Sequence, residues 1–135
     1  MTQQEYFDST VEKVLRSIGC TIDISITMLD HDTLDKKQRE ALGLCWRAND
    51  YNYKITIDEF FVSECYKYFI EDKFWSTWEL VGETLEEVIC HELAHISQWN
   101  HCKKHRTITQ ELLSCVELPK KYYEYLEKLK KRVSA

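Results

Sequence analysis

The sequence predicts an α+β fold: a small three-stranded antiparallel or mixed sheet packed on a helix that carries an HExxH motif, with further helices at the N- and C-terminal ends. Three observations favour this class. Apolar residues recur at helical spacing in several segments, and apolar–polar alternation is confined to residues 20–57. Only three glycines and one proline occur in the chain, which is typical of helix-rich structure with few tight turns.

The length and composition predict one globular domain over residues 1–135, since a core of that size can be stable without disulfide bonds or bound metal ions. Six scattered cysteines without a CxxC pair argue against a zinc ribbon or a disulfide scaffold. The polar N-terminus is not a secretory signal, and no apolar run approaches the roughly 20 residues of a membrane span. We therefore expect an intracellular, cytoplasmic protein.

The net charge of -5 is unevenly distributed along the chain. Residues 1–102 carry 9 Lys and Arg against 19 Asp and Glu, whereas residues 103–135 carry 9 against 4. A solvated basic helix would explain the second segment. The alternative is a basic surface that contacts DNA.

The first two elements are predicted from end signals and apolar spacing. Residues 2–19 form an amphipathic helix, because Thr2 and Glu5 make a capping-box pattern and Gly19 is a natural C-terminal stop. Residues 20–29 form a half-buried strand. Its alternating apolar positions are Ile22, Ile24, Ile26 and Met28.

A hairpin and a helix follow. Residues 30–42 are polar and predict a loop or a short exposed helix. Leu44–Arg47 and Tyr53–Ile57 are the two strands of the hairpin, with the turn at residues 48–50. Residues 59–71 have the apolar spacing of a helix, and an aromatic-rich connection follows them.

The helix with the HExxH motif begins at a second capping box, made by Thr84 and Glu87. We expect it to run to about Trp99 or Asn100. Its apolar stripe, which we expect to face the core, consists of Leu85, Val88, Ile89, Ile96 and Trp99. Two helices complete the chain: one from a Thr107–Gln110 capping pair to about Glu117, and one opened by Pro119.

The motif itself indicates a zinc site. His91 and His95 are four residues apart, so a helix places both imidazoles on one face, within reach of one Zn²⁺. Glu92 lies next to the open coordination position, where it can act as general base on a zinc-bound water. The reaction this predicts is hydrolysis of a peptide bond.

Three residues are candidates for the third ligand. His101 has the metzincin spacing, but Gln98 stands where that pattern has Gly for the turn. His105 lies just before the predicted start of the next helix, and we favour it. Glu111 would complete a His-His-Glu set, as in gluzincins.

The segment TLEEVICHELAHISQWNHCKKHR resembles the SprT-like (Spartan-type) zinc metallopeptidases. That family has HELxH, often an aromatic and a His a few residues later, and a third His that opens HGxxF/W. Upstream, LGLCWRANDYNYKITIDEFF is similar to the family's strand pair, which commonly reads Gly-x-Cys followed by an aliphatic strand. The resemblance extends from about Leu42 to Leu113 and implies a minigluzincin-like core.

Carried over by residue, the resemblance implies that His91 and His95 are ligands, that Glu92 is catalytic and that His105 is the third ligand. It also implies a zinc-dependent endopeptidase that acts on protein or peptide substrates, including DNA-associated proteins. Two positions depart from the pattern, since Arg106 replaces the expected Gly and Thr109 the aromatic. Aligning HCKKH with HGxxF/W would instead make His101 the ligand, as in WLM-type hydrolases.

Two other functions are compatible with the motif. An ImmA/IrrE-like regulatory peptidase would use Glu111 as its third ligand, although QELLSC does not match that family's usual helix. A non-catalytic module would use zinc only to brace a DNA- or protein-binding surface. Many SprT-like proteins also carry a Cys-rich ribbon, and this sequence has none, so DNA contact would depend on residues 103–135 or on a partner.

Overall fold

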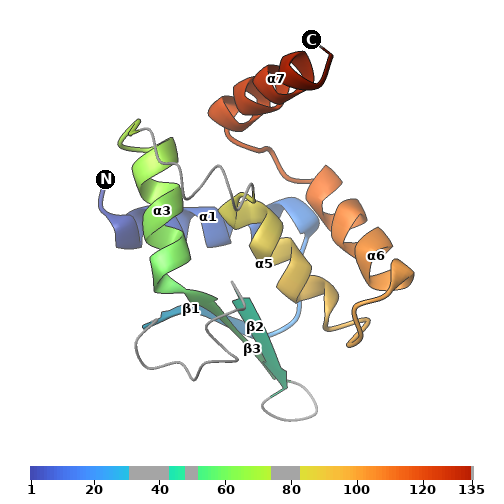
Figure 1. The fold of residues 1–135 in the computed structure, drawn as a ribbon. Coiled ribbons are helices and arrows are strands. Elements are labelled where there is room, and N and C mark those ends of the chain that lie inside the picture. Colours follow the sequence, from blue (N-terminus) through green and yellow to red (C-terminus); the bar gives the residue numbers. More distant parts are fainter. Residues whose placement is uncertain (31–42, 48–51, 74–82, 135) are drawn as a thin grey trace.

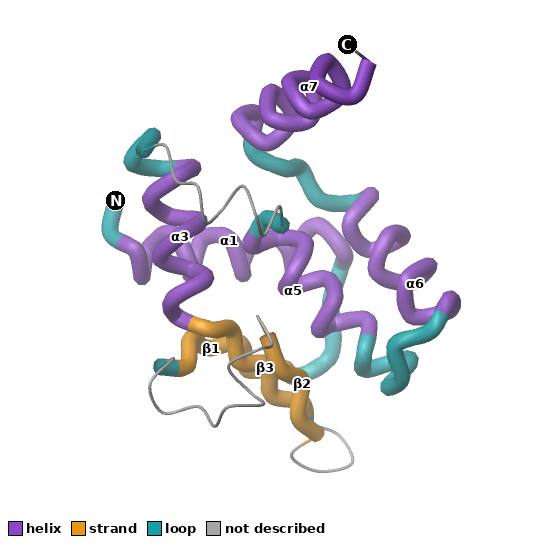
Figure 2. The backbone as a smooth tube through the Cα atoms, in the orientation of Figure 1, coloured by secondary structure: helices purple, strands orange, loops and turns teal. Residues whose placement is uncertain are grey.

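The computed structural model describes residues 1–30, 43–47, 52–73 and 83–134. These residues form five helices and a three-stranded mixed sheet, as the predicted α+β class requires (Figures 1 and 2). The elements in chain order are α1 (Gln3–Ile18), β1 (Ile24–Leu29), β2 (Gly43–Arg47), β3 (Tyr53–Asp58), α3 (Glu59–Phe69), α5 (Leu85–Ala94), α6 (Lys103–Ser114) and α7 (Lys120–Ser134). The predicted loop or helix at 31–42, the hairpin turn and the aromatic connection at 74–82 lie outside the described residues.

The sheet has the strand order β1-β3-β2. β2 pairs antiparallel with β3, with Gly43 opposite Ile57, which confirms the predicted hairpin. β1 pairs parallel with β3, with Ile24 opposite Tyr53, so the sheet is mixed. β1 is shorter than predicted, since it begins at Ile24 and not at residue 20. Ile22, one of its predicted apolar positions, precedes the strand and is 48% exposed.

Local end signals determine where three helices begin or stop. Both predicted capping boxes are present: Thr2 with Glu5 on α1, and Thr84 with Glu87 on α5. Gly19 ends α1 in the left-handed conformation, with φ 66°, which glycine adopts at no steric cost. α7 begins at Lys120, directly after Pro119, as predicted.

The hydrophobic core lies between the helices and one face of the sheet. α5 is its central element, since it contacts α1, α6, β2 and β3 (Figure 1). The buried apolar side chains come from α1 (Tyr6, Phe7, Val14), β3 (Ile55, Ile57), α3 (Phe61, Val62, Cys65, Tyr68), α5 (Leu85, Val88, Ile89, Cys90, Leu93) and the segment after α6 (Val116). This packing holds the motif-bearing helix against β2.

Two predictions about the helix boundaries after the motif are wrong. α5 ends at Ala94, not near Trp99, and Trp99 is 55% exposed instead of facing the core. α6 begins at Lys103, so Thr107 is inside the helix and not at its cap. The Thr107 hydroxyl donates to the Lys103 carbonyl, a bond within one helical turn that Thr often makes.

α7 is attached to the rest of the molecule near its first turn. The Lys121 ammonium donates to the Tyr68 carbonyl over 2.7 Å and to the Asp72 carboxylate over 2.6 Å, and it lies 3.9 Å from the Tyr68 ring centre. This ammonium lowers the pKa of Asp72. No helix among the described residues has both the length and the apolarity to cross a membrane.

Candidate metal centre

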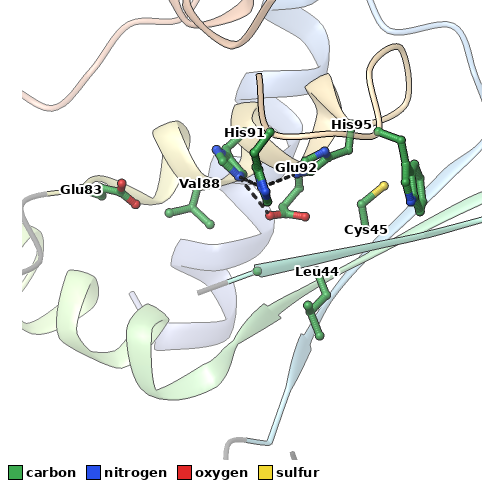
Figure 3. Close-up of a pocket in the computed structure, with 10 residues that line it drawn as sticks. Leu44, Cys45, Glu83, Val88, His91, Glu92 and His95 are labelled. Atoms are coloured by element: carbon green, nitrogen blue, oxygen red, sulfur yellow. Dashed lines mark hydrogen bonds and ion pairs between the residues drawn. The ribbon is translucent and has the colours of Figure 1, made fainter. Parts of the chain in front are cut away.

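α5 presents the first two histidines of the motif on one face. His91 lies in the last turn of the helix, and His95 is its C-cap residue. The backbone of His95 is still right-handed helical, with φ -63° and ψ -21°. The two side chains therefore project together, as expected for residues four apart on a helix. In Figure 3 both rings point into the same space, beside Glu92.

The segment between α5 and α6 brings a third histidine to this pair. The Nε2 atom of His101 lies 3.2 Å from Nε2 of His91 and 3.0 Å from Nε2 of His95. A tetrahedral zinc ion, about 2.05 Å from each imidazole nitrogen, separates its ligands by about 3.3 Å. The ligand atoms of these three histidines lie within 4.8 Å of one another, and among the described residues they are the group suited to a metal ion.

The orientation of His95 suits metal binding. Its Nδ1 atom is 3.2 Å from the Gln98 carbonyl oxygen. A carbonyl only accepts hydrogen bonds, so Nδ1 carries the proton and Nε2 keeps its lone pair. Metal-binding histidines commonly have such a partner on the second nitrogen. The residues present therefore fit a zinc ion.

The chain returns to His101 without a glycine. Among the described residues other than glycine, only Asp72 has a positive φ, so Gln98 adopts no left-handed conformation. The glycine of the metzincin pattern is thus not needed here. Gln98 therefore does not count against His101, and the predicted helix start at Thr107 does not favour His105, since α6 begins at Lys103.

The other two ligand candidates lie elsewhere. His105 is inside α6 and is 1% exposed, and its Nε2 atom is 2.9 Å from the His91 carbonyl oxygen. The His105 ring packs beside the three converging histidines, but none of its nitrogens belongs to the group of possible metal ligands. Glu111 is exposed near the C-terminal end of α6 and does not join the group.

The imidazoles of α5 are held in the neutral form that binds metals. Burial, together with the charges that the neighbouring histidines would carry, lowers the pKa of His91 to about 4. Burial also lowers the pKa of His95, with His105 contributing. Both rings are thus neutral at neutral pH, with one ring nitrogen free of a proton, so a metal ion would not have to displace a proton from that nitrogen.

Glu92 lies beside the histidines and is buried. Its Oε1 atom is 3.9 Å from Nε2 of His91, and the residue is 4% exposed. Burial raises its pKa to about 7. A carboxyl with that pKa can both accept and release a proton near neutral pH, which is what a general base and acid must do.

A cleft of about 480 Å³ opens in front of this group. One wall is β2, which carries Leu44 and Cys45, and the opposite wall is α5, with His91 and Glu92 (Figure 3). The cleft is also lined by Gly43, His101, Trp99 and Glu83. Its volume is in the range of small-molecule binding sites.

The contribution of Gly43 was not predicted. A Cβ atom at this position would lie 3.0 Å from Cγ of Glu92, 3.1 Å from Cδ1 of Ile57 and 3.2 Å from Cγ1 of Val88. The glycine lets β2 approach the carboxylate closely. A glycine at the start of a strand pattern is the signal that could have indicated this approach.

Cys45 faces the cleft but has the properties of a lining residue. Burial and the Glu92 carboxylate raise the pKa of its thiol to about 11. It therefore stays protonated at neutral pH, and a protonated thiol is a poor nucleophile. Its sulfur is also not part of the group suited to a metal ion.

No family model, curated protein or solved structure matches this chain.

Proposed function

We propose that the protein is a zinc-dependent metalloendopeptidase of SprT-like type with a minigluzincin-like core. The observation that carries the proposal is the convergence of three imidazole nitrogens beside a buried glutamate at the floor of a cleft. Histidine nitrogens suit zinc, and three protein ligands leave the fourth position open, as in catalytic zinc sites. Protein or peptide substrates are the class that this chemistry serves.

The ligands of the proposed site are His91, His95 and His101. The short Nε2 distances favour His101 over His105, whose Nε2 faces a carbonyl. The second alignment of the SprT-like pattern agrees with this choice. In it, His101 opens the HGxxF/W segment and His105 takes the aromatic position.

Bound here, zinc would supply Lewis acidity, which polarises a peptide carbonyl and makes water acidic near neutral pH. Glu92 holds and moves the proton: a carboxylate oxygen accepts it from the attacking water and later delivers it to the leaving amine. The position of Glu92 between the histidines and β2 places that carboxyl at the floor of the cleft.

The ligand count supports an enzyme over a bracing site. Structural zinc sites usually have four protein ligands. Among the described residues the metal-suited group has three members, and Cys45 is not one of them. The exposed position of Glu111 does not favour the ImmA/IrrE-like alternative.

The experiment that tests the metal site measures zinc per chain in purified protein and in two variants. We expect one zinc per chain in the wild type, retention in Glu111→Ala and near-complete loss in His101→Ala. Zinc-free wild-type protein that takes up no zinc would contradict the proposal. Full zinc content in His101→Ala would contradict the ligand assignment.

The catalytic role of Glu92 is tested with Glu92→Gln. The amide keeps the shape of the side chain but cannot take up the proton, so we expect zinc content to be unchanged and cleavage of a denatured protein to fall at least about 100-fold. Glu111→Gln, on the neighbouring helix, is the matched control and should cleave like the wild type. Equal cleavage by Glu92→Gln and the wild type would contradict the mechanism.

We also propose that the basic C-terminal third contacts DNA. α6 begins with Lys103, Lys104 and Arg106, all exposed, and α7 exposes further lysines. Such side chains neutralise backbone phosphates without reading sequence. A DNA-bound protein would then be brought near the cleft.

A further inference from the structure

His105 contacts both motif histidines without being part of the group of converging nitrogens. Its ring lies face to face with the His95 ring, with centres 4.1 Å apart and an interplanar angle of 24°. It meets the His91 ring edge-on, with centres 4.6 Å apart. The side chain is almost fully buried, so these contacts are shielded from water.

The hydrogen bond of His105 defines its tautomer. Nε2 lies 2.9 Å from the His91 carbonyl oxygen, which can only accept, so Nε2 carries the proton. A protonated nitrogen has no lone pair for a metal ion. In this arrangement His105 is a donor to the backbone, not a ligand through Nε2.

The His91 carbonyl needs such a donor because α5 ends early. The His95 amide donates to the Glu92 carbonyl over 3.1 Å, and the Ile96 amide to the Leu93 carbonyl over 3.1 Å. These bonds span three residues instead of four, so the His91 carbonyl does not receive the His95 amide. Carbonyls in the last turn of a helix commonly require an outside partner.

We propose that His105 is a positioning residue that sets the orientation of His91 and His95. Its Nε2–H ties the backbone of His91 to α6, and its ring confines the His95 imidazole from one face. The Gln98 carbonyl holds the Nδ1 side of that same imidazole. With both constraints in place, Nε2 of His95 is directed at His101 before any metal binds.

The proposal rests on the proposed function in one respect, that the oriented nitrogens bind zinc. Partners that orient metal-binding histidines typically change metal affinity by about 10- to 100-fold. We therefore expect His105→Phe, which keeps a ring but has no donor, to weaken zinc binding by about tenfold or more. His105→Gln places an amide N–H near the position of Nε2 and should retain more of the affinity than His105→Phe.

A purely structural role is separated by a matched variant on the same helix. Leu112 packs against the core from α6, and Leu112→Ala should destabilise the fold while leaving zinc affinity within about twofold. Co²⁺ absorption provides a second readout, because a loosened ligand set changes the intensity of the tetrahedral bands. The two variants are compared under conditions in which both are fully folded. If Leu112→Ala then loses as much zinc affinity as His105→Phe, the positioning role is overturned.

A tautomer measurement distinguishes this proposal from the proposed function. Long-range ¹H–¹⁵N correlation spectra at one neutral pH report which ring nitrogen carries the proton. We expect His105 protonated at Nε2 and His95 at Nδ1 in metal-free protein, and His105 unchanged after zinc is added. Loss of the Nε2 proton of His105 on zinc addition would show it to be a ligand and overturn the proposal. If the protein binds no zinc, only the proposed function is contradicted. The spectrum of the metal-free protein still shows whether Nε2 of His105 carries the proton of the proposed hydrogen bond.

Discussion

At the scale of single residues, the ionisation of Glu92 links the candidate site to folding. Its pKa is about 7 in the folded chain against an ordinary value of 4.5. Between these pH values the folded protein binds more protons than the unfolded chain, so this group makes stability fall as pH rises from about 4.5 to 7. His91 has the opposite effect: its pKa is lowered from 6.5 to about 4, so this group makes stability rise as pH rises from about 4 to 6.5.

Glu92→Gln isolates the first effect, since both proteins keep His91. Without metal, we expect the variant to exceed the wild type in free energy of unfolding by about 2–3 kcal/mol at pH 8, and by much less at pH 5. Urea denaturation in the presence of a chelator measures this. Parallel stability curves for the two proteins would mean that Glu92 ionises normally. Glu111→Gln, at an exposed position, should follow the wild type throughout.

The close approach at Gly43 leads to a second prediction for a single residue. Gly43→Ala inserts a methyl group 3.0 Å from Cγ of Glu92, and overpacking of this kind costs about 1–3 kcal/mol. We expect lower stability, unchanged zinc content and slower cleavage, because the displaced side chain is the proposed general base. Gly19→Ala is the control. A Cβ there meets nothing within 4 Å, so its cost of about 1 kcal/mol comes from the left-handed backbone and should not affect cleavage.

At the scale of secondary-structure elements, the capping box of α5 supports the motif helix. The Thr84 hydroxyl accepts from the Glu87 amide over 3.1 Å. We expect Thr84→Ala to cost about 1 kcal/mol. Thr107→Ala should cost less than about 0.5 kcal/mol, because its hydroxyl bonds within α6 and caps nothing. Denaturation midpoints of the two variants measure the difference. An equal loss of stability in both variants would show that the Thr84 cap does not stabilise α5.

At the scale of the whole molecule, the ion pair of Lys13 with Glu86 joins segments far apart in the chain. Lys13 of α1 donates to the Glu86 carboxylate of α5 over 2.7 Å and to the Glu117 carbonyl over 2.8 Å. Glu86 is 2% exposed, so removing Lys13 leaves a buried charge without its partner.

We expect Lys13→Met to lower the free energy of unfolding by about 2–3 kcal/mol, less than for a fully buried pair because the lysine is partly exposed. The double variant Lys13→Met with Glu86→Met should recover to within about 1 kcal/mol of the wild type, since no buried charge remains. A double-variant cycle by urea denaturation measures both. A double variant as unstable as Lys13→Met alone would contradict the account.

The distribution of charge over the molecule supports a prediction about DNA. Replacing exposed Lys128 and Lys131 of α7 with Gln should weaken DNA binding uniformly across sequences. It should also reduce the slope of log affinity against log salt by about 2, one unit for each lost phosphate contact. Lys54→Gln, on the exposed side of β3, is the control. Unchanged affinity and slope in the α7 variant would remove the proposed DNA contact.

Much of this protein follows from the sequence alone. The capping boxes at Thr2 and Thr84, the stop at Gly19, the hairpin of β2 and β3, and the α+β class are confirmed. These features depend on neighbours a few residues apart, whose geometry is nearly independent of the remaining chain. The pairing of His91 with His95 on one face has the same origin.

Only the tertiary structure decided how the third histidine joins this pair. α5 ends at Ala94 and contacts β2 and α6, and tertiary contacts of this kind commonly outweigh the helix preference of the following residues. The shorter helix lets the chain turn early, which brings His101 to the Nε2 atoms and leaves the His91 carbonyl for His105. Both outcomes depend on contacts between elements distant in sequence. Local propensity cannot specify such contacts, because they result from the combined packing of α5, α6 and the sheet.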